Sequence, residues 1–285
     1  MKIPNFPYHF ARAEAAAARA LYRSLLPAIV RSPLRARGSI PLEVFAYSGE
    51  SALPEQVASI RSFLRYAGRP KRFTVVSDGT YSSRSVELLK RIDPVVSIGN
   101  TGDWMPKVLP DELQLYLGTH ATGKQLALIM SLPANGPALY VDSDVLFFPG
   151  ARDLIAHLAV SNVPAFYLAD CDLAADRRLF RDPAETNHPV NTGVLVLLQK
   201  LDWSLSLGRF GELEGAPIFF TNQTMAHLTM HANGAKPLDE SKYVLQRDDQ
   251  FIYRDHHRGS DLALRHYVNP VRHRFWTRIA RRGAW

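Results

Sequence analysis

Two aspartates one residue apart, Asp142 and Asp144, follow a run of apolar residues in the segment ALYVDSDVLFF. A second apolar run follows them directly, so both carboxylates lie in a setting where burial is costly unless a cation or hydrogen bonds compensate it. In a strand, residues i and i+2 point to the same face, and the two side chains are expected to project together. Two convergent carboxylates suit Mg²⁺ or Mn²⁺ carrying a substrate diphosphate. The alternative is a turn that exposes both side chains to water.

Strand and helix patterns alternate around this pair, which predicts an α/β fold with a mostly parallel central sheet flanked by helices. Buried strands are expected at residues 42–49, 72–79, 94–99, 137–148, 163–170 and 190–198, helices at 54–66, 83–92, 123–132 and 222–231, and a small C-terminal strand pair at 242–246 and 251–255.

Parallel sheets bind their ligands at the carboxyl ends of the strands. The polar residues that end each apolar run are therefore the candidates for a binding site. They are Ser48, Asp78, Asp142, Asp144 and Asp170.

The segment ALYVDSDVLFF resembles the DxD element of GT-A-fold glycosyltransferases, especially the glycogenin and bacterial galactosyltransferase-like family of retaining enzymes. The resemblance extends in order over about residues 41 to 276. It implies that Asp142 contacts the ribose of a nucleotide and a metal ion, and that Asp144 binds the metal directly.

A second match lies downstream, in HYVNPVRH, where His266 and Arg272 have the family's spacing of a histidine and a basic residue six positions later. The resemblance implies that His266 completes the metal shell and that Arg272 binds the diphosphate. Both roles are chemically sensible, since neutral imidazole suits Mn²⁺ and a guanidinium binds phosphate bidentately. Asn269 stands where the family has glycine, and Arg272 replaces its lysine.

Two further segments resemble family elements close to the donor sugar. HPVNTGVLVLL places Asn191 toward the sugar or the acceptor, with Gly193 allowing close approach to the backbone. FFTNQTMAHL keeps Gln223 of an Asp-Gln pair but has Asn222 in place of the aspartate. The resemblance thus makes Asn191 and Gln223 the candidate catalytic residues.

The remaining candidates for donor binding rest on position. Lys124 begins the helix before the DxD strand, where the family often has a basic residue that contacts the donor. An ordinary solvent-exposed lysine at the start of a helix is an equally good interpretation. Ser48 and Asp78 end strands where GT-A enzymes hold the base and ribose of the nucleotide.

These matches imply a metal-dependent glycosyltransferase that moves a sugar from a nucleoside-diphosphate sugar, with a UDP-sugar favoured, to a hydroxyl of a glycan, lipid-linked or protein acceptor. Its Mn²⁺ or Mg²⁺ ion would be held by Asp142, Asp144 and His266. A nucleotidyltransferase is the nearest rival, but AYSGESALP lacks the glycine-rich basic loop that such an enzyme carries after its first strand. A basic membrane- or nucleic-acid-binding adaptor is a third reading, and it leaves the buried aspartates unexplained.

The chain has 285 residues and a formal net charge of +7, with arginines concentrated at both ends. This length suits one large domain, and we expect a basic amphipathic helical segment at 1–40 and a single GT-A catalytic domain with a basic tail at 41–285. The ends could touch an anionic membrane, with Phe275, Trp276, Ile279 and Trp285 among the C-terminal arginines; no nucleic-acid partner is expected.

The composition also bears on the compartment. Cys171 is the single cysteine, which excludes an internal disulfide and fits a reducing compartment, and we expect it to be a small buried side chain. No apolar run reaches the roughly 20 residues that a membrane span needs. The sequence therefore predicts a cytoplasmic protein, with peripheral contact at the inner membrane face as an option.

Overall fold

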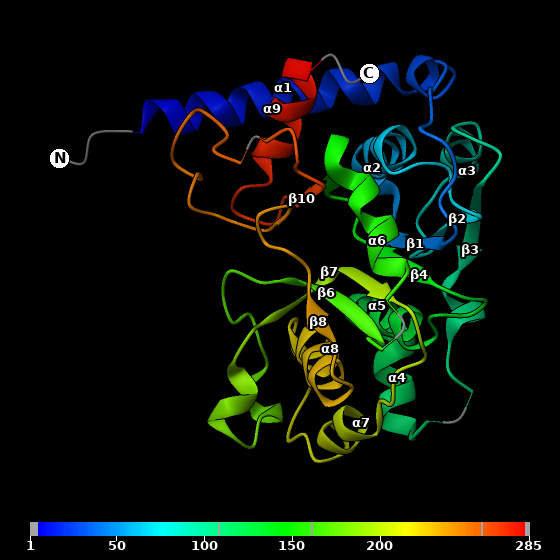
Figure 1. The fold of residues 1–285 in the computed structure, drawn as a ribbon, viewed down its shortest axis with the longest axis vertical. Helices are drawn as coiled ribbons and strands as arrows, with labels where there is room; N and C mark the ends of the chain where they lie inside the picture. The colour runs from blue at the N-terminus through cyan, green and yellow to red at the C-terminus, as the bar shows by residue number, and fades with distance from the viewer. Residues whose placement is uncertain (1–4, 108, 161, 258, 283–285) are drawn as a thin grey trace.

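The fold was examined in a computed structural model that describes residues 5–107, 109–160, 162–257 and 259–282. Its centre is a seven-stranded sheet with the order β3-β2-β1-β4-β7-β6-β8 (Figure 1). The strands of this sheet are β1 (Glu43–Ser48), β2 (Arg72–Ser77), β3 (Val96–Asn100), β4 (Ala138–Val141), β6 (Ala165–Ala169), β7 (Val190–Leu197) and β8 (Lys236–Pro237).

The sheet is mostly parallel, as the alternation of strands and helices predicts. β1 pairs in parallel with both β2 and β4, and β2 pairs in parallel with β3. The two antiparallel pairs are both made by β7, which lies between β4 and β6. The carboxyl ends of β1, β2 and β4 therefore meet at one edge of the sheet, beside the amino end of β7.

Helices cover both faces of the sheet. The α-helices are α1 (Phe6–Ile29), α2 (Leu53–Tyr66), α3 (Ser83–Lys90), α4 (Asp111–Thr119), α5 (Ala121–Met130), α6 (Leu154–Leu158), α7 (Ser204–Gly211), α8 (Thr221–Ala232) and α9 (His273–Arg282). The 3-10 helices are η1 (Glu50–Ala52), η2 (Thr101–Trp104), η3 (Pro149–Asp153), η4 (Arg177–Leu179) and η5 (Pro183–Thr186). α2, α3 and α6 lie on one face with α1 and α9 beyond them, and α4, α5, α7 and α8 lie on the other (Figure 1).

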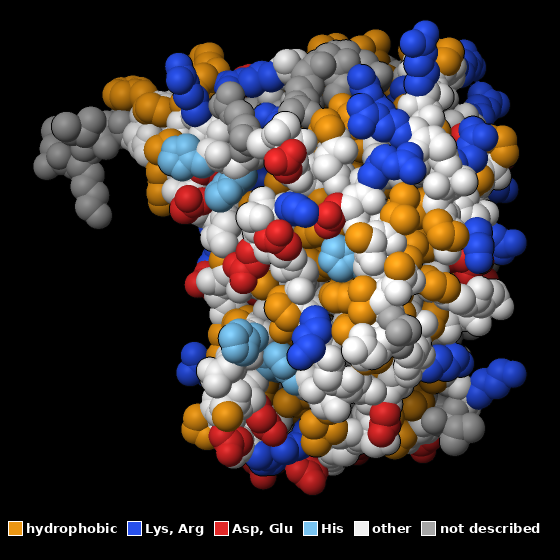
Figure 2. Space-filling model, viewed as in Figure 1, with side chains coloured by type: hydrophobic (Ala, Val, Ile, Leu, Met, Phe, Trp, Pro, Cys, Tyr) orange, Lys and Arg blue, Asp and Glu red, His pale blue; other side chains and the backbone are white. Residues whose placement is uncertain are grey.

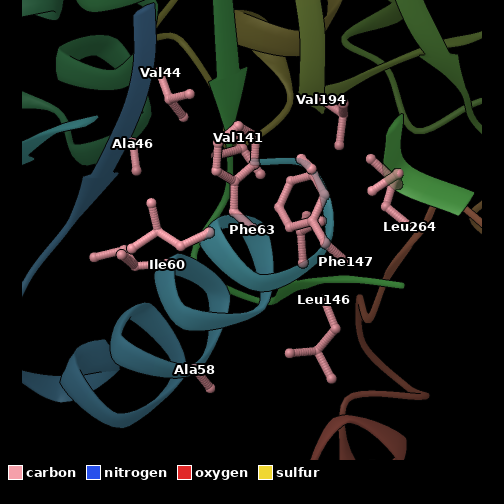
Figure 3. Close-up of a cluster of buried hydrophobic side chains, with 14 of the residues drawn as sticks. Val44, Ala46, Ala58, Ile60, Phe63, Val141, Leu146, Phe147, Val194 and Leu264 are labelled. Carbon is pink, nitrogen blue, oxygen red and sulfur yellow. The ribbon is translucent and has the colours of Figure 1, made fainter. Parts of the chain in front are cut away.

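Alternation along the strands feeds two cores. Val44 and Ala46 of β1 point into the core beneath α2, whereas Phe45 between them points into the core beneath α5. Figure 3 shows the first core, where Phe63 of α2 lies between the strands and Phe147. The rings of Phe63 and Phe147 meet edge to face, with centroids 5.0 Å apart.

Residues 137–148, expected as one central strand, form two strands in different sheets. β4 ends at Val141, the chain turns, and β5 (Val145–Phe147) leaves the large sheet. β5 pairs antiparallel with β10 (Leu264–His266), which in turn pairs in parallel with β9 (Tyr243–Val244). The small C-terminal sheet is thus mixed, and one of its strands comes from the middle of the chain.

The strand expected at residues 251–255 is absent from the structure, where this segment consists of turns and bends. Its backbone is held by side chains in place of a strand partner. Arg274 donates hydrogen bonds to the carbonyl oxygens of Asp249 and Tyr253, and Arg265 pairs with Asp249 and Asp255. Of the five residues of FIYRD, only Asp255 is buried, and it is held there by Arg265 and not by a strand partner.

The two ends of the chain pack against each other, as α1 and α9 lie side by side (Figure 1). Phe275, Trp276 and Ile279 of α9 are buried in the core that α1 covers, so they do not face the solvent. Trp285 lies outside the described residues.

Two smaller differences concern local structure. α4, α6, α7 and α9 were not expected, and α5 begins two residues earlier than the predicted helix. Cys171 is only partly buried, in the loop after β6. Within the described ranges, every helix is too short or too polar to cross a bilayer.

Candidate active site

The pair Asp142 and Asp144 lies in the turn that joins β4 to β5, at the carboxyl edge of the large sheet. Neither residue is in a strand, so the expected strand face does not explain their convergence. The turn nevertheless keeps Asp144 at 5% exposure, and the side chain of Asp142 at 26%. The reading in which both aspartates face water is therefore wrong.

His266 joins the two aspartates through the pairing of β5 with β10. His266 lies opposite Val145 in that ladder, and the next backbone amide, of Tyr267, donates to the carbonyl oxygen of Asp144 at 3.0 Å. One ligand atom each of Asp142, Asp144 and His266 lies within 4.8 Å of the others. The structure thus brings together all three residues predicted to bind a metal.

Asp142 has one carboxylate oxygen occupied by neighbours. Its Oδ1 accepts hydrogen bonds from the Tyr140 hydroxyl at 2.8 Å and from Gln125 Nε2 at 3.0 Å, while Oδ2 faces His266 Nε2 at 3.6 Å. Gln125 is in turn held by Asn222, whose Nδ2 donates to Gln125 Oε1 at 2.9 Å. Asn222 therefore orients a neighbour of the aspartate pair.

Asp144 is satisfied by two basic groups. His266 Nε2 lies 3.0 Å from Asp144 Oδ1, and Arg272 Nε donates to Oδ2 at 3.1 Å. Burial acts to raise the pKa of Asp144, but His266 and Arg272 outweigh it and lower the pKa to about 2. For Asp142 burial prevails, and its pKa is raised. Arg272, with its side chain 53% exposed, pairs with Asp144 at the mouth of the site.

Asn191 sets the orientation of the His266 ring. Asn191 Oδ1 accepts from the backbone amide of Gly193, and its Nδ2 donates to Asp170 Oδ2, both at 2.9 Å, so the two ends of the amide are assigned. The oxygen of this amide lies 2.9 Å from His266 Nδ1, which must therefore carry a proton. In neutral imidazole this leaves the lone pair on Nε2, aimed at the two carboxylates.

This donor set fits a divalent cation. Two carboxylates and an imidazole nitrogen are ligands of Mn²⁺, and an outer hydrogen bond on the second ring nitrogen is typical of a metal-binding histidine. The structure also leaves no room for a side chain at Gly193, where a Cβ would lie 2.1 Å from His266 Cε1. Gly193 thus lets β7 approach the histidine closely.

The three residues open into a cleft of about 290 Å³. It is lined by Thr122, Gln125, Asp142, Asp144, Asp170, Asp172, Ala174, Asn191, Thr192, Phe219, Phe220, Asn222, Gln223, Arg247, His266, Val268, Asn269 and Arg272. Gln223 Nε2 donates to Asp170 Oδ2 at 3.2 Å and to the carbonyl oxygen of Ala174 at 2.9 Å. Asp170 therefore joins both predicted catalytic residues, Asn191 and Gln223.

Three predicted donor-binding residues do not line this cleft. Ser48 ends β1 and bonds to Gln56 and Tyr81, while Asp78 follows β2 and accepts from Thr80. Both lie at the same edge of the sheet, farther along it. Lys124 is on the first turn of α5, and its neighbour Gln125 is the residue that reaches Asp142.

Sequence patterns did not single out several residues of the cleft. Gln125 has no distinguishing spacing, because it reaches Asp142 through the packing of α5 on β4, whereas Tyr140 lies on β4 only two residues before Asp142. Arg247 forms an ion pair with Asp172 at the cleft. Phe219 and Phe220 are 67% and 38% exposed, and only their adjacency to Gln223 in the sequence could have drawn attention to them.

The sheet order, the two covering helix layers and the aspartate turn at the carboxyl edge define the GT-A fold. Solved structures share it. Galactosyltransferase LgtC in complex with donor and acceptor sugar analogs aligns with a TM-score of 0.54 and 13% identity over 84% of this chain and 95% of its own. Mouse xyloside xylosyltransferase 1 aligns with a TM-score of 0.55 and 14% identity over 81% of this chain and 99% of its own.

Glycosyltransferase GlyE of Streptococcus pneumoniae TIGR4 aligns with a TM-score of 0.51 and 13% identity over 83% of this chain and 59% of its own. No family model and no curated protein sequence matches the chain. The similarity to known proteins is therefore one of fold, and the predicted GT-A fold is confirmed.

Proposed function

We propose that this protein is a metal-dependent glycosyltransferase that moves a sugar from a nucleoside-diphosphate sugar to a hydroxyl acceptor. The observation that carries the proposal is the convergence of Asp142, Asp144 and His266, with Arg272 beside them, in a cleft at the carboxyl edge of a GT-A sheet. Galactosyl and xylosyl transfer appear in the names of two proteins of the same fold, which supports the same reaction class here.

The chain's own groups divide the work of such a transfer. A divalent ion held by Asp142, Asp144 and His266 would neutralise negative charge on the leaving diphosphate. Arg272 is placed to exchange its contact with Asp144 for the phosphate oxygens, because its side chain is half exposed. Asn191 keeps the Nε2 lone pair of His266 aimed into the site.

Gln223 and Asp170 occupy the wall of the cleft beside Asn191, and we assign them to positioning the donor sugar and the acceptor hydroxyl. We propose a UDP-sugar as donor, Mn²⁺ or Mg²⁺ as the ion, retention of the anomeric configuration, and a glycan, lipid-linked or protein acceptor. Ser48, Asp78 and Lys124 remain proposed contacts of the nucleotide.

A peripheral membrane contact is proposed for α1, at the inner face of the membrane. Its outward side exposes Phe6, Phe10, Leu21 and Leu25 at 70%, 62%, 51% and 42%. Since Phe275, Trp276 and Ile279 of α9 are buried, α1 is, among the described residues of the two basic ends, the part that offers apolar side chains.

A thermal-shift panel tests the proposed reaction class. We expect one of UDP-, GDP- and dTDP-sugars to raise the melting temperature only when Mn²⁺ is present, because ion and diphosphate bind the folded state together. The variant Asp144→Asn should lose this stabilisation and all but a small fraction of transfer activity. The charge-neutral Asn retains the size of the side chain but is a weaker metal ligand.

The matched control is Asp172→Asn, which removes a carboxylate of the same cleft that is outside the metal set. It should keep the metal-dependent shift. Full metal-dependent transfer by Asp144→Asn would refute the proposed function, and the absence of any nucleotide response would favour a non-enzymatic role.

A further inference from the structure

The first turn of α8 carries two amide side chains that point to different walls of the active-site cleft. Successive residues of an α-helix are about 100° apart around its axis, so Asn222 and Gln223, which both line the cleft, diverge. The turn is anchored by the residue before them, because the buried Thr221 hydroxyl donates to Asp176 Oδ2 at 2.7 Å. From this fixed turn, hydrogen bonds lead to two different proposed metal ligands.

The first arm, made of Asn222 and Gln125, ends at Asp142. Asn222 Nδ2 donates to Gln125 Oε1 at 2.9 Å, and Gln125 Nε2 donates to Asp142 Oδ1 at 3.0 Å. The fully buried Tyr140 donates from its hydroxyl to the same carboxylate oxygen at 2.8 Å. Since Oδ1 already accepts two hydrogen bonds, the first arm presents Oδ2 to an ion.

The second arm, made of Gln223, Asp170 and Asn191, ends at His266. Gln223 Nε2 donates to Asp170 Oδ2 at 3.2 Å, and Asn191 Nδ2 donates to the same oxygen at 2.9 Å. Asn191 Oδ1 then faces His266 Nδ1 at 2.9 Å, which keeps the Nε2 lone pair turned toward the carboxylates. The arm uses the nitrogen end of the Gln223 amide, so its oxygen end can still serve the proposed contact with the donor sugar.

A carboxylate sets the direction of the hydrogen bonds in each arm. When ionised, Asp142 and Asp170 only accept hydrogen bonds, so the amide nitrogens that face them are assigned. In the first arm this leaves the Gln125 oxygen to accept from Asn222. A reversed amide would bring two acceptors together in a cleft wall where Asn222 and Asn191 are no more than 6% exposed.

The amides of the two arms, Asn222, Gln125, Gln223 and Asn191, are uncharged. Most of the Lys and Arg side chains visible in Figure 2 lie over the half of the molecule that carries α1 and α2, whereas α8 lies in the other half (Figure 1). Replacing one of these amides by an apolar side chain therefore changes the hydrogen bonds of a ligand without changing the charge of the cleft. Its effect on ion binding reports positioning and not electrostatic attraction.

We propose that the first turn of α8 is the positioning element of the metal site, and that Asn222, Gln125 and Gln223 are its positioning residues. It acts on Asp142 through the first arm and on His266 through the second. The inference rests on the proposed function, because it takes these two residues as metal ligands. It adds that one helix, which supplies no ligand, aligns ligands from two separate segments, the β4–β5 turn and β10.

Side-chain amide signals in heteronuclear NMR test the two arms without metal or nucleotide. Asn222→Ala should shift the NH₂ signals of Gln125 and leave those of Asn191 in place, and Gln223→Met should do the reverse. Gln125→Met breaks the first arm from α5 and should likewise leave the Asn191 signals in place, which keeps the test available if Asn222→Ala unfolds. Variants that shift neither signal, or both equally, would overturn the division into two arms.

Mn²⁺ titration in electron paramagnetic resonance measures the effect on the ion. Gln125→Met should weaken Mn²⁺ binding roughly 10- to 100-fold, as the loss of an outer hydrogen-bond partner does. The control Gln199→Met removes an exposed amide that does not line the cleft and should leave the affinity unchanged. Adding Asn222→Ala to Gln125→Met should cost little more, because the first arm is already broken, whereas adding Gln223→Met should multiply the two losses.

The outcomes separate this inference from the proposed function. Parent-like Mn²⁺ affinity in Gln125→Met and Gln223→Met, or multiplied losses within the first arm, would overturn the inference alone. A parent chain that shows both arms in NMR but binds no Mn²⁺ would overturn the metal site, and with it both the proposed function and this inference.

Discussion

At the scale of single residues, the central feature is that each ring nitrogen of His266 has a defined partner. Nε2 faces Asp144 and Nδ1 faces the Asn191 oxygen. Without a cation, both nitrogens can donate protons: burial acts to lower the pKa of His266, but Asp144 and Asp142 outweigh it and raise the pKa. Binding of an ion at Nε2 would therefore be accompanied by proton release.

Asn191→Ala tests the role of this hydrogen bond. We expect Mn²⁺ affinity to fall by roughly 10- to 100-fold, because outer-shell partners of metal-binding histidines contribute that much. The affinity is measured by Mn²⁺ titration in electron paramagnetic resonance, without donor or acceptor. Asn233→Ala, an asparagine at the end of α8 that is outside the cleft, serves as the control. Unchanged Mn²⁺ affinity in Asn191→Ala would show that the amide does not orient the ring.

At the scale of elements, the site depends on how closely β7 approaches β10. Gly193 of β7 faces the His266 ring, and the two segments are otherwise held by β4, β5 and the turn between them. A backbone hydrogen bond from the Asp142 amide to the Gly193 carbonyl, at 2.8 Å, closes this arrangement. Moving any one of these strands would move a proposed ligand.

Gly193→Ala should therefore be harmful although it adds only a methyl group. Its Cβ would lie 2.1 Å from His266 Cε1, so the ring or the strand must shift, at a cost of roughly 1–3 kcal/mol in unfolding free energy. Mn²⁺ binding should weaken as well. Gly208→Ala in α7 is the matched control, since its Cβ would meet open space and should be neutral or slightly stabilising. Equal urea stability of the two variants would contradict this account.

The loop at residues 246–258 is another element whose position is set by β10. Arg265, fully buried, donates to both carboxylate oxygens of Asp249 and to Asp255. Burial acts to raise the pKa of Asp249, but Arg265 and Arg274 outweigh it and lower the pKa. The ionised form is therefore the one that stabilises the fold, and Arg247 on the same loop reaches the cleft.

Asp249→Asn should lower the free energy of unfolding by roughly 3–5 kcal/mol at pH 7, because it leaves a buried arginine uncompensated. A carboxyl whose pKa is lowered on folding stabilises above its unfolded pKa of about 3.9, and this contribution is lost as the pH falls through the folded value. The difference between parent and variant should thus shrink only below about pH 4. Urea unfolding at several pH values measures it, and a constant difference down to pH 3 would disprove the pairing as its cause.

At the scale of the whole molecule, the first and last helices, α1 and α9, pack against each other and both contact α2. Trp276 of α9 stacks obliquely on Tyr22 of α1, with ring centroids 5.2 Å apart. Its Nε1 donates to Glu55 Oε1 at 2.9 Å, and Arg19 of α1 pairs with the same carboxylate. α1 is therefore part of the folded core and not an appendage on it.

Trp276→Ala should reduce the free energy of unfolding by roughly 3–5 kcal/mol, as for other large buried aromatic residues. Trp276→Phe keeps a ring against Tyr22 but loses the N–H donor, and it should recover a large part of that loss. Chemical unfolding followed by far-UV circular dichroism compares the two. A loss below about 1 kcal/mol in Trp276→Ala would mean that the closure of α1 on α9 contributes little to stability.

The sequence by itself determined the strands and the candidates for the metal site. The strands around 42–49 and 72–79 and the helix at 54–66 follow from local periodicity, since burial on a sheet or helix face imposes it. The aspartate pair stood out because buried carboxylates need compensation, and the resemblance supplied His266 and Arg272 from their spacing.

Only the tertiary structure decided how these residues meet. His266 and Asp144 are 122 positions apart, and they touch because β5 leaves the large sheet and pairs with β10. Gln125 and Asn191 likewise gain their partners from the packing of separate elements. Periodicity reports which face of an element is buried, but not which distant element covers it, so the ligand set was visible in the sequence while its hydrogen-bonded support was not.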